Sequence, residues 1–227
     1  MDWNSLLTWI LIALFLIGIL AFYQASFKAE RKTKNIAFDA IIIAIILVMG
    51  LIPQVGYLFI LPWLALTLLH IPVLVGASIG GAKRGALYGL VFGLTSMAQA
   101  AMNGTGLNAF FVYPWIALPP RIVFGFLAGL FFSLTKRSPK LSGGLGKGVL
   151  SFFLTILHTG LVFLTLYAFY PGEIGGYFAS SDPVAEGVAI TFLVSVLLGA
   201  LGEATLAAVM VPLIDRPLRK MESARQK

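Results

Sequence analysis

Six polar side chains lie inside long apolar stretches of this chain, namely Asp39, His70, Arg121, His158, Thr159 and Glu203. Arg121 is the most informative, because an arginine at the centre of a membrane helix costs between about 2.5 and 10 kcal/mol or more. Its planar guanidinium can bind a carboxylate through two parallel hydrogen bonds. That carboxylate belongs either to a ligand or to Glu203. The sequence therefore predicts an anion-binding site or a buried ion pair.

Other kinds of chemistry find little support. His70 and His158 have no second carboxylate beside them and no H-E-x-x-H motif occurs, so we expect no metal site. There is no cysteine and no G-x-S-x-G elbow, which argues against a nucleophilic enzyme. The stretch GASIGGAKRG at 76–85 lacks the G-K-[ST] order of a phosphate loop, because Arg84 follows Lys83. We expect a tight turn between two helices there, with no catalytic residue and no cofactor in this chain.

The elements that carry these side chains are expected to be membrane helices. The chain is 59% hydrophobic and 11% charged over 227 residues, with a mean hydropathy of +0.95, which is typical of an all-α polytopic membrane protein. Seven apolar stretches are long enough to cross a bilayer, at 5–24, 35–52, 57–81, 85–101, 112–135, 148–170 and 185–214. Prolines interrupt the third stretch, so we expect 53–66 to be a hydrophobic loop or broken segment before a helix at about 67–82.

Basic residues mark one side of the membrane. Every lysine and arginine except Arg121 belongs to one of four clusters, at 28–34, 83–84, 136–147 and 216–227. The positive-inside rule assigns these clusters to the cytoplasm, so we expect the N-terminus outside and the C-terminus inside. The net charge of +7 is thereby explained without nucleic-acid binding. The first basic cluster follows the stretch 5–24, which favours a retained helix over a signal peptide.

Small residues recur at helical spacing. Gly85, Gly89 and Gly93 stand four residues apart, as do Gly125 and Gly129. Such stripes let two helix backbones approach closely, and we expect the glycines to pack inside the protein. Ala40 and Ala44 form a similar pair, and for them packing against another subunit is as plausible as internal packing.

Polar and aromatic residues concentrate toward the expected outer side. The candidate ligand-binding residues are Arg121, His158, Thr159, Asn103, Asn108, Tyr113, Trp115 and His70. The loop 102–112 and the following helix start have the composition of a lid over an outward-facing pocket. Pro119 and Pro120 are expected to break the helix beside Arg121 and to free backbone carbonyls. Each polar residue also has a structural alternative, since His70 can cap a broken helix and His158 can bond a carbonyl.

Four stretches carry a family resemblance. HIPVLVGASIGGAKRGALYGLVFGLTS at 70–96 is similar to the signature of the substrate-binding S components of energy-coupling factor (ECF) vitamin transporters. LPPRIVFGFLAGL at 118–130, LHTGLVFL at 157–164 and GEATLAAVMVP at 202–212 resemble later helices of that family. The resemblance implies a six-helix substrate-binding domain at 35–215. It leaves an extra transmembrane helix with a cytoplasmic linker at 1–34 and a basic cytoplasmic tail at 216–227.

The resemblance also implies partners. An S component of the bacterial plasma membrane binds a vitamin from outside and works with a membrane coupling subunit and two cytoplasmic ATPases, which use the ATP. The whole subunit is thought to topple in the membrane. The A-x-x-x-A motif that contacts the coupling subunit in the family matches Ala40 and Ala44. The added helix at 5–24 departs from the family pattern and puts in doubt how the subunit tilts.

The identity of the vitamin is the next expectation. One cation with several hydrogen-bonding groups suits a small anionic polyol or amide, and pantothenate fits that description best. Riboflavin is the alternative, because Phe110, Phe111, Tyr113, Trp115 and Tyr167 could stack on a flat ring, and folates, thiamine precursors and cobalamin stay open. Two other classes compete. An intramembrane enzyme would turn over a lipid-linked substrate without an ATPase, and a regulatory subunit would bind no small ligand.

Overall fold

The computed structural model describes residues 33–61, 64–103, 106–135, 138–172 and 183–224. The expected N-terminal helix at 5–24 lies outside these residues. The chain divides into two compact units, Met1–Ala40 and Ile41–Lys227. Of the first unit, the structure describes the opening turns of one helix, α2 (Thr33–Leu51), which continues into the second unit.

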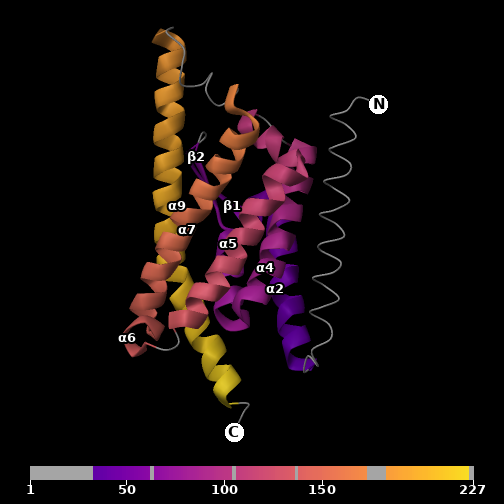
Figure 1. Cartoon of the computed structure of the whole chain (residues 1–227), viewed down its shortest axis with the longest axis vertical. Coiled ribbons are helices and arrows are strands. Elements are labelled where there is room, and N and C mark those ends of the chain that lie inside the picture. The colour runs from indigo at the N-terminus through magenta and orange to yellow at the C-terminus, as the bar shows by residue number, and fades with distance from the viewer. Residues whose placement is uncertain (1–32, 62–63, 104–105, 136–137, 173–182, 225–227) are drawn as a thin grey trace. The chain divides into compact units, whose positions relative to one another are not determined.

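The described chain is almost entirely helical (Figure 1). After α2 come α3 (Pro53–Gly56), β1 (Tyr57–Leu61), β2 (Leu64–Thr67), α4 (His70–Asn103), the 3-10 helix η1 (Gly106–Val112), α5 (Pro114–Thr135), α6 (Pro139–Ser142), α7 (Gly144–Phe169) and α9 (Pro183–Ala224). Four of these helices hold segments long and apolar enough to cross a membrane, at His70–Met102, Pro114–Thr135, Gly144–Phe169 and Val194–Leu218. A shorter apolar helix covers Ile36–Leu51. The expected all-α polytopic class is confirmed.

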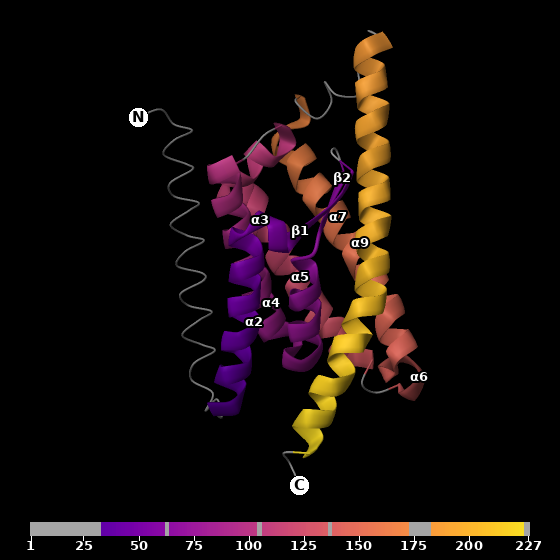
Figure 2. The same ribbon diagram turned by 180° about the vertical axis from the view of Figure 1, so that it is seen from behind.

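The third apolar stretch differs from the prediction of a loop or broken segment. Here α3 is followed by β1 and β2, which pair as antiparallel strands, with Tyr57 opposite Thr67 and Leu58 opposite Leu66. Figure 2 shows this hairpin beside α9, against which β2 packs. Two paired strands satisfy each other's backbone groups, and that makes a non-helical segment tolerable at membrane depth. Helix α4 begins directly after it, with Pro72 in the first turn, where a missing N–H is tolerated.

The turn predicted at 76–85 is present as a break inside α4. Gly81 has φ 76° and ψ −173°, so α4 consists of two helices, at 70–80 and 82–103. A positive φ is a conformation that glycine adopts without the steric penalty of a Cβ atom. When α4 is counted as two, the described helices that can build the bundle are α2, both parts of α4, α5, α7 and α9, which fits the six expected from the resemblance.

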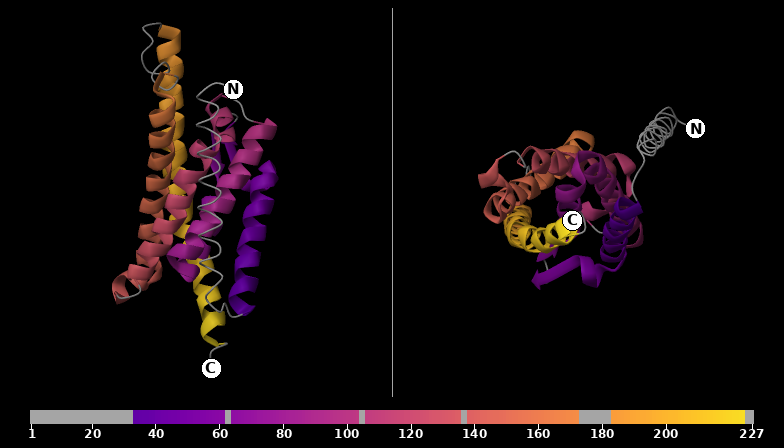
Figure 3. Two further views of the ribbon diagram at one scale, coloured as in Figure 1. Left: turned by 45° about the vertical axis from the view of Figure 1, so that its right-hand side comes forward. Right: turned by 90° about the horizontal axis from the view of Figure 1, so that it is seen from below.

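Glycines bring α4 and α5 into close contact. A Cβ atom on Gly85 would meet the carbonyl oxygen of Gly125, and one on Gly89 would meet that of Arg121. Farther along, Gly129 faces the backbone of Gly81 in the same way. The prediction of internal packing for these glycines is confirmed. Helix α7 packs on α5 and on α9, and Figure 3 shows α7 and α9 side by side in both views.

Candidate ligand-binding site

Arg121 is buried in α5, with 5% of its surface exposed. Helix α5 runs unbroken through Pro119 and Pro120, so the expectation of a break beside Arg121 is wrong. The expectation of a freed carbonyl is right, because Pro120 has no N–H to donate to Ile116 one turn earlier. The guanidinium takes that place, and Nη1 of Arg121 donates to the Ile116 oxygen at 3.2 Å. The Ile116 carbonyl, which Pro120 leaves without a backbone donor, is thus satisfied by the side chain of Arg121 in the same helix.

Two aromatic rings hold the same guanidinium. Its central carbon lies 4.3 Å from the ring centroid of Phe111 and 5.8 Å from that of Phe92. Phe111 comes from η1 and Phe92 from the second part of α4. Cation–π contacts of this kind are worth about 2 kcal/mol where the cation is desolvated. The charge is therefore buried against two apolar rings, and inside the protein an anion would be attracted to it far more strongly than in water.

His158 lies next to this group in the bundle interior. The side chain is 8% exposed, and its ring centroid lies 4.7 Å from that of Phe124 and 5.5 Å from that of Phe92. Phe92 thus touches both His158 and Arg121, so α4, α5 and α7 meet at one ring. Among the described residues, Nε2 of His158 has no hydrogen-bond partner. A buried polar atom in that state costs about 1–3 kcal/mol, and a polar ligand atom would relieve this cost.

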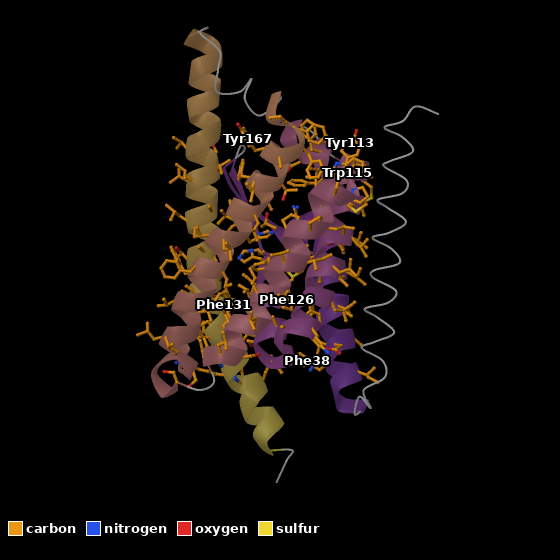
Figure 4. All side chains as sticks on the ribbon, in the orientation of Figure 1. Phe38, Tyr113, Trp115, Phe126, Phe131 and Tyr167 are labelled. Atoms are coloured by element: carbon orange, nitrogen blue, oxygen red, sulfur yellow. The ribbon has the colours of Figure 1, made fainter. Side chains whose placement is uncertain are left out.

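A cluster of aromatic rings covers one end of the site. The rings of Tyr113 and Trp115 stack with centroids 5.0 Å apart, and Tyr113 stacks on Tyr170 at 6.0 Å. Phe110 of η1 packs on Tyr170 as well, at 4.5 Å. Figure 4 shows Tyr113 and Trp115 next to each other where α5 begins, with Tyr167 near the same end of α7. The cluster joins η1 and the start of α5 to the end of α7.

Glu203 was a candidate ion-pair partner for Arg121, but its carboxylate bonds a different group. Its Oε1 accepts a hydrogen bond from the backbone N–H of Thr67 at 2.6 Å, which fastens the hairpin to α9. The backbone oxygen of Glu203 lies 3.3 Å from Nε2 of His70, at the start of α4. The structure thus places the Glu203 carboxylate on the hairpin and the Arg121 guanidinium on Ile116. The described contacts of these two side chains thus include no ion pair between Arg121 and Glu203.

Five further predicted residues are Thr159, Asn103, Asn108, Ala40 and Ala44. Thr159 follows His158 and its hydroxyl donates to the Thr155 carbonyl at 3.4 Å. Asn108 lies exposed on η1, and Asn103 ends α4, its side chain being outside the described part. Ala40 and Ala44 are exposed on α2 and take no part in this site.

Sequence reasoning missed Phe92, whose ring lies beside both Arg121 and His158, and Phe124, whose ring lies beside His158. A signal for Phe92 was available, because it follows Gly89 by one helical turn. Gly89 contacts the backbone of Arg121, and a side chain one turn farther along the same helix face must lie beside α5. Phe124 had a similar signal, one turn after Arg121.

A family model describing the substrate-specific component of ECF transporters matches residues 34–214. The chain belongs to this family. This S component is similar to the pantothenic acid transporter PanT of Lactococcus lactis subsp. cremoris, with 28% identity over 197 residues that cover 77% of this chain and 97% of the relative. The pantothenate transporter PanT of Leuconostoc mesenteroides subsp. mesenteroides is 31% identical over 147 residues, which cover 62% of this chain and 72% of the relative.

Family membership settles the general function. The S component is a multi-pass membrane protein and the vitamin-binding subunit of an ECF transporter. The matched region begins at residue 34, so the segment before it lies outside the family domain. This transport role argues against the two competing classes, an intramembrane enzyme and a regulatory subunit.

Proposed function

We propose that this S component captures pantothenate from outside the cell and that Arg121 binds the carboxylate of the vitamin. The observation that carries the proposal is the buried guanidinium, held on rings from two other elements beside His158. The names of the two relatives support pantothenate as the ligand. A cation in apolar surroundings selects an anion, and the fork of a guanidinium matches the two oxygens of a carboxylate.

The rest of the ligand would extend toward His158. Pantothenate carries an amide and two hydroxyl groups besides its carboxylate, and each can bond an imidazole nitrogen. Nε2 of His158 is buried and lacks a partner among the described residues. Thr159, His70, Tyr113, Trp115, Asn103 and Asn108 complete the set of proposed contacts. In this arrangement Phe92 separates the anionic end of the ligand from its polyol end.

Transport requires partners. We propose that the S component delivers pantothenate inward together with a coupling subunit and two ATPases, which supply the ATP. Ala40 and Ala44 are exposed on α2 and would form the contact with the coupling subunit. The N-terminus would lie outside and the C-terminus in the cytoplasm, as the basic clusters indicate.

Calorimetric titration of the purified S component tests the role of Arg121. The ligands are pantothenate and its alcohol analogue, in which CH₂OH replaces the carboxylate. We expect Arg121→Met to weaken pantothenate binding by about 100-fold or more, because two charge-assisted hydrogen bonds are lost. The wild type should prefer pantothenate to the alcohol, and the variant should bind both weakly and without discrimination.

Lys83→Met is the matched control, because it removes an exposed cation from the turn in α4. It should leave the affinity unchanged. Tight binding of pantothenate by Arg121→Met would remove Arg121 from the site but keep the vitamin. No binding of pantothenate by the wild type would overturn the choice of vitamin.

A further inference from the structure

A polar cavity lies away from Arg121, where α6, the start of α7 and the last part of α9 meet. It has a volume of about 400 Å³ and is lined by Ser142, Gly143, Gly144, Lys147, Asp215, Arg216 and Pro217. Figure 2 shows α6 beside the lower part of α9. The position of this cavity along the helices is informative. The apolar span of α7 begins at Gly144 and that of α9 ends at Leu218. If these spans cross the bilayer, we expect the cavity at the level of the membrane surface.

The charges in the cavity leave a net cation. Lys147 forms an ion pair with Asp215, which is fully buried, and the other oxygen of Asp215 accepts a hydrogen bond from Ser78 at 2.6 Å. Among the described residues that line the cavity, Asp215 is the one carboxylate, and both of its oxygens are thereby engaged. Arg216 is exposed on the wall and adds a second positive charge. An anion entering the cavity therefore meets the charge of Arg216 beside an ion pair whose two charges offset each other.

Glycine makes the room for this arrangement. A Cβ atom on Gly144 would collide with the guanidinium of Arg216, so the guanidinium lies directly over the first turn of α7. Gly143, which caps that helix, contributes no side chain. The backbone dipoles of α7 add to the positive potential at the same place.

The surface beside the cavity is apolar. Leu145 is 84% exposed, and Leu141, Val149 and Phe153 on the same helices are also exposed. A leucine this exposed, at the start of a membrane span, is suited to contact with acyl chains. A polar cavity at the membrane surface with apolar side chains below it matches a phospholipid, whose phosphate and acyl chains require those two surroundings.

We infer that this cavity binds the phosphate group of an anionic phospholipid, with Arg216 as its cationic contact. The lipid then bridges the start of α7 and the end of α9. This inference concerns a site separate from that of Arg121, and its test does not depend on which vitamin is bound.

Native mass spectrometry of the purified S component measures the lipid that stays bound. The probes are phosphatidylglycerol, phosphatidylcholine and inorganic phosphate, each added to the delipidated protein. We expect the wild type to retain phosphatidylglycerol in preference to phosphatidylcholine. Arg216→Gln should lower the retained phosphatidylglycerol by about fivefold or more, because one cation near a membrane surface contributes about that factor.

Gly144→Ala is a second variant that keeps every charge and displaces the guanidinium. It should lower lipid retention as well. Its matched control is Gly160→Ala in the same helix, where a Cβ atom meets nothing within 4 Å. Lys83→Gln controls for the loss of a cation elsewhere. Thermal unfolding by tryptophan fluorescence verifies that each variant is folded.

Four outcomes would overturn the inference. The first is unchanged retention in both Arg216→Gln and Gly144→Ala, and the second is an equal loss in the two controls. Equal retention of phosphatidylcholine would remove the preference for an anionic lipid. Full displacement of the lipid by inorganic phosphate would identify the cavity as a site for a soluble anion instead.

Discussion

The ion pair between Lys147 and Asp215 predicts how much the free energy of unfolding falls when either charge is removed. The two side chains are 9% and 0% exposed, and they join α7 to α9. The hydrogen bond from Ser78 to Asp215 adds the first part of α4. Three helices are thus connected at one carboxylate. Removal of either charged partner leaves the other charge buried and uncompensated, which costs about 3–5 kcal/mol.

The perturbation is a set of three variants, Asp215→Leu, Lys147→Met and the two combined. A loss of 1 kcal/mol lowers Tm by about 2–4 °C in a domain of this size. Each single variant should therefore melt about 6–20 °C below the wild type. The double variant should recover most of that loss, because an apolar pair of similar volume is often as stable as a buried ion pair.

The assay is thermal unfolding of the purified protein followed by intrinsic tryptophan fluorescence, since the chain has four tryptophans and no cysteine for a thiol-reactive dye. Lys83→Met is a matched control for the loss of an exposed lysine and should melt within about 2 °C of the wild type. The reasoning is refuted if the single variants melt with the wild type. It is also refuted if the double variant loses the sum of the two single losses, because the charges would then act independently.

Two further predictions concern helix contacts. Gly89→Leu should lower the free energy of unfolding by about 1–3 kcal/mol or more, since its Cβ would meet the Arg121 carbonyl oxygen. Gly160→Leu is the control and should be tolerated, because a Cβ there meets nothing within 4 Å. Equal shifts of Tm in the two variants would contradict the close packing at Gly89. Replacement of both Ala40 and Ala44 by Trp should stop uptake by the complete transporter in proteoliposomes while binding by the isolated S component persists; normal uptake would exclude them from the subunit contact.

The glycine stripes show how much of the fold the sequence contains. The spacing of Gly85 and Gly89 predicted a close helix contact, and it is present because only a residue without Cβ lets two backbones meet there. The hairpin at 57–67 was not predicted. Its strands are apolar on both faces in the sequence, so the run lacks the alternation that indicates a strand. The structure also bonds Thr67 of β2 to Glu203, which is far away in the chain.

The candidate site, like the fold, could be predicted where a local pattern decides the structure and could not be predicted where tertiary packing does. Arg121 and His158 were recognisable as polar residues in apolar stretches, whatever their surroundings. The partner of Arg121 was not, although the missing N–H of Pro120 is a local feature that frees the Ile116 carbonyl. Whether the guanidinium would turn to that carbonyl or to Glu203 depended on tertiary packing, which a local pattern does not contain.

The packing of α4 on α5 and the chemistry of the site come from the same few residues. Gly89 brings the α4 backbone against the carbonyl of Arg121. One turn farther along, that approach places the ring of Phe92 between the guanidinium and His158. A residue larger than glycine at position 89 would therefore move the ring as well as the helix. The spacing of Gly89 and Phe92 thus serves both the helix contact and the ligand-binding site. When the contact between α4 and α5 is widened, ligand affinity and the free energy of unfolding should therefore fall together.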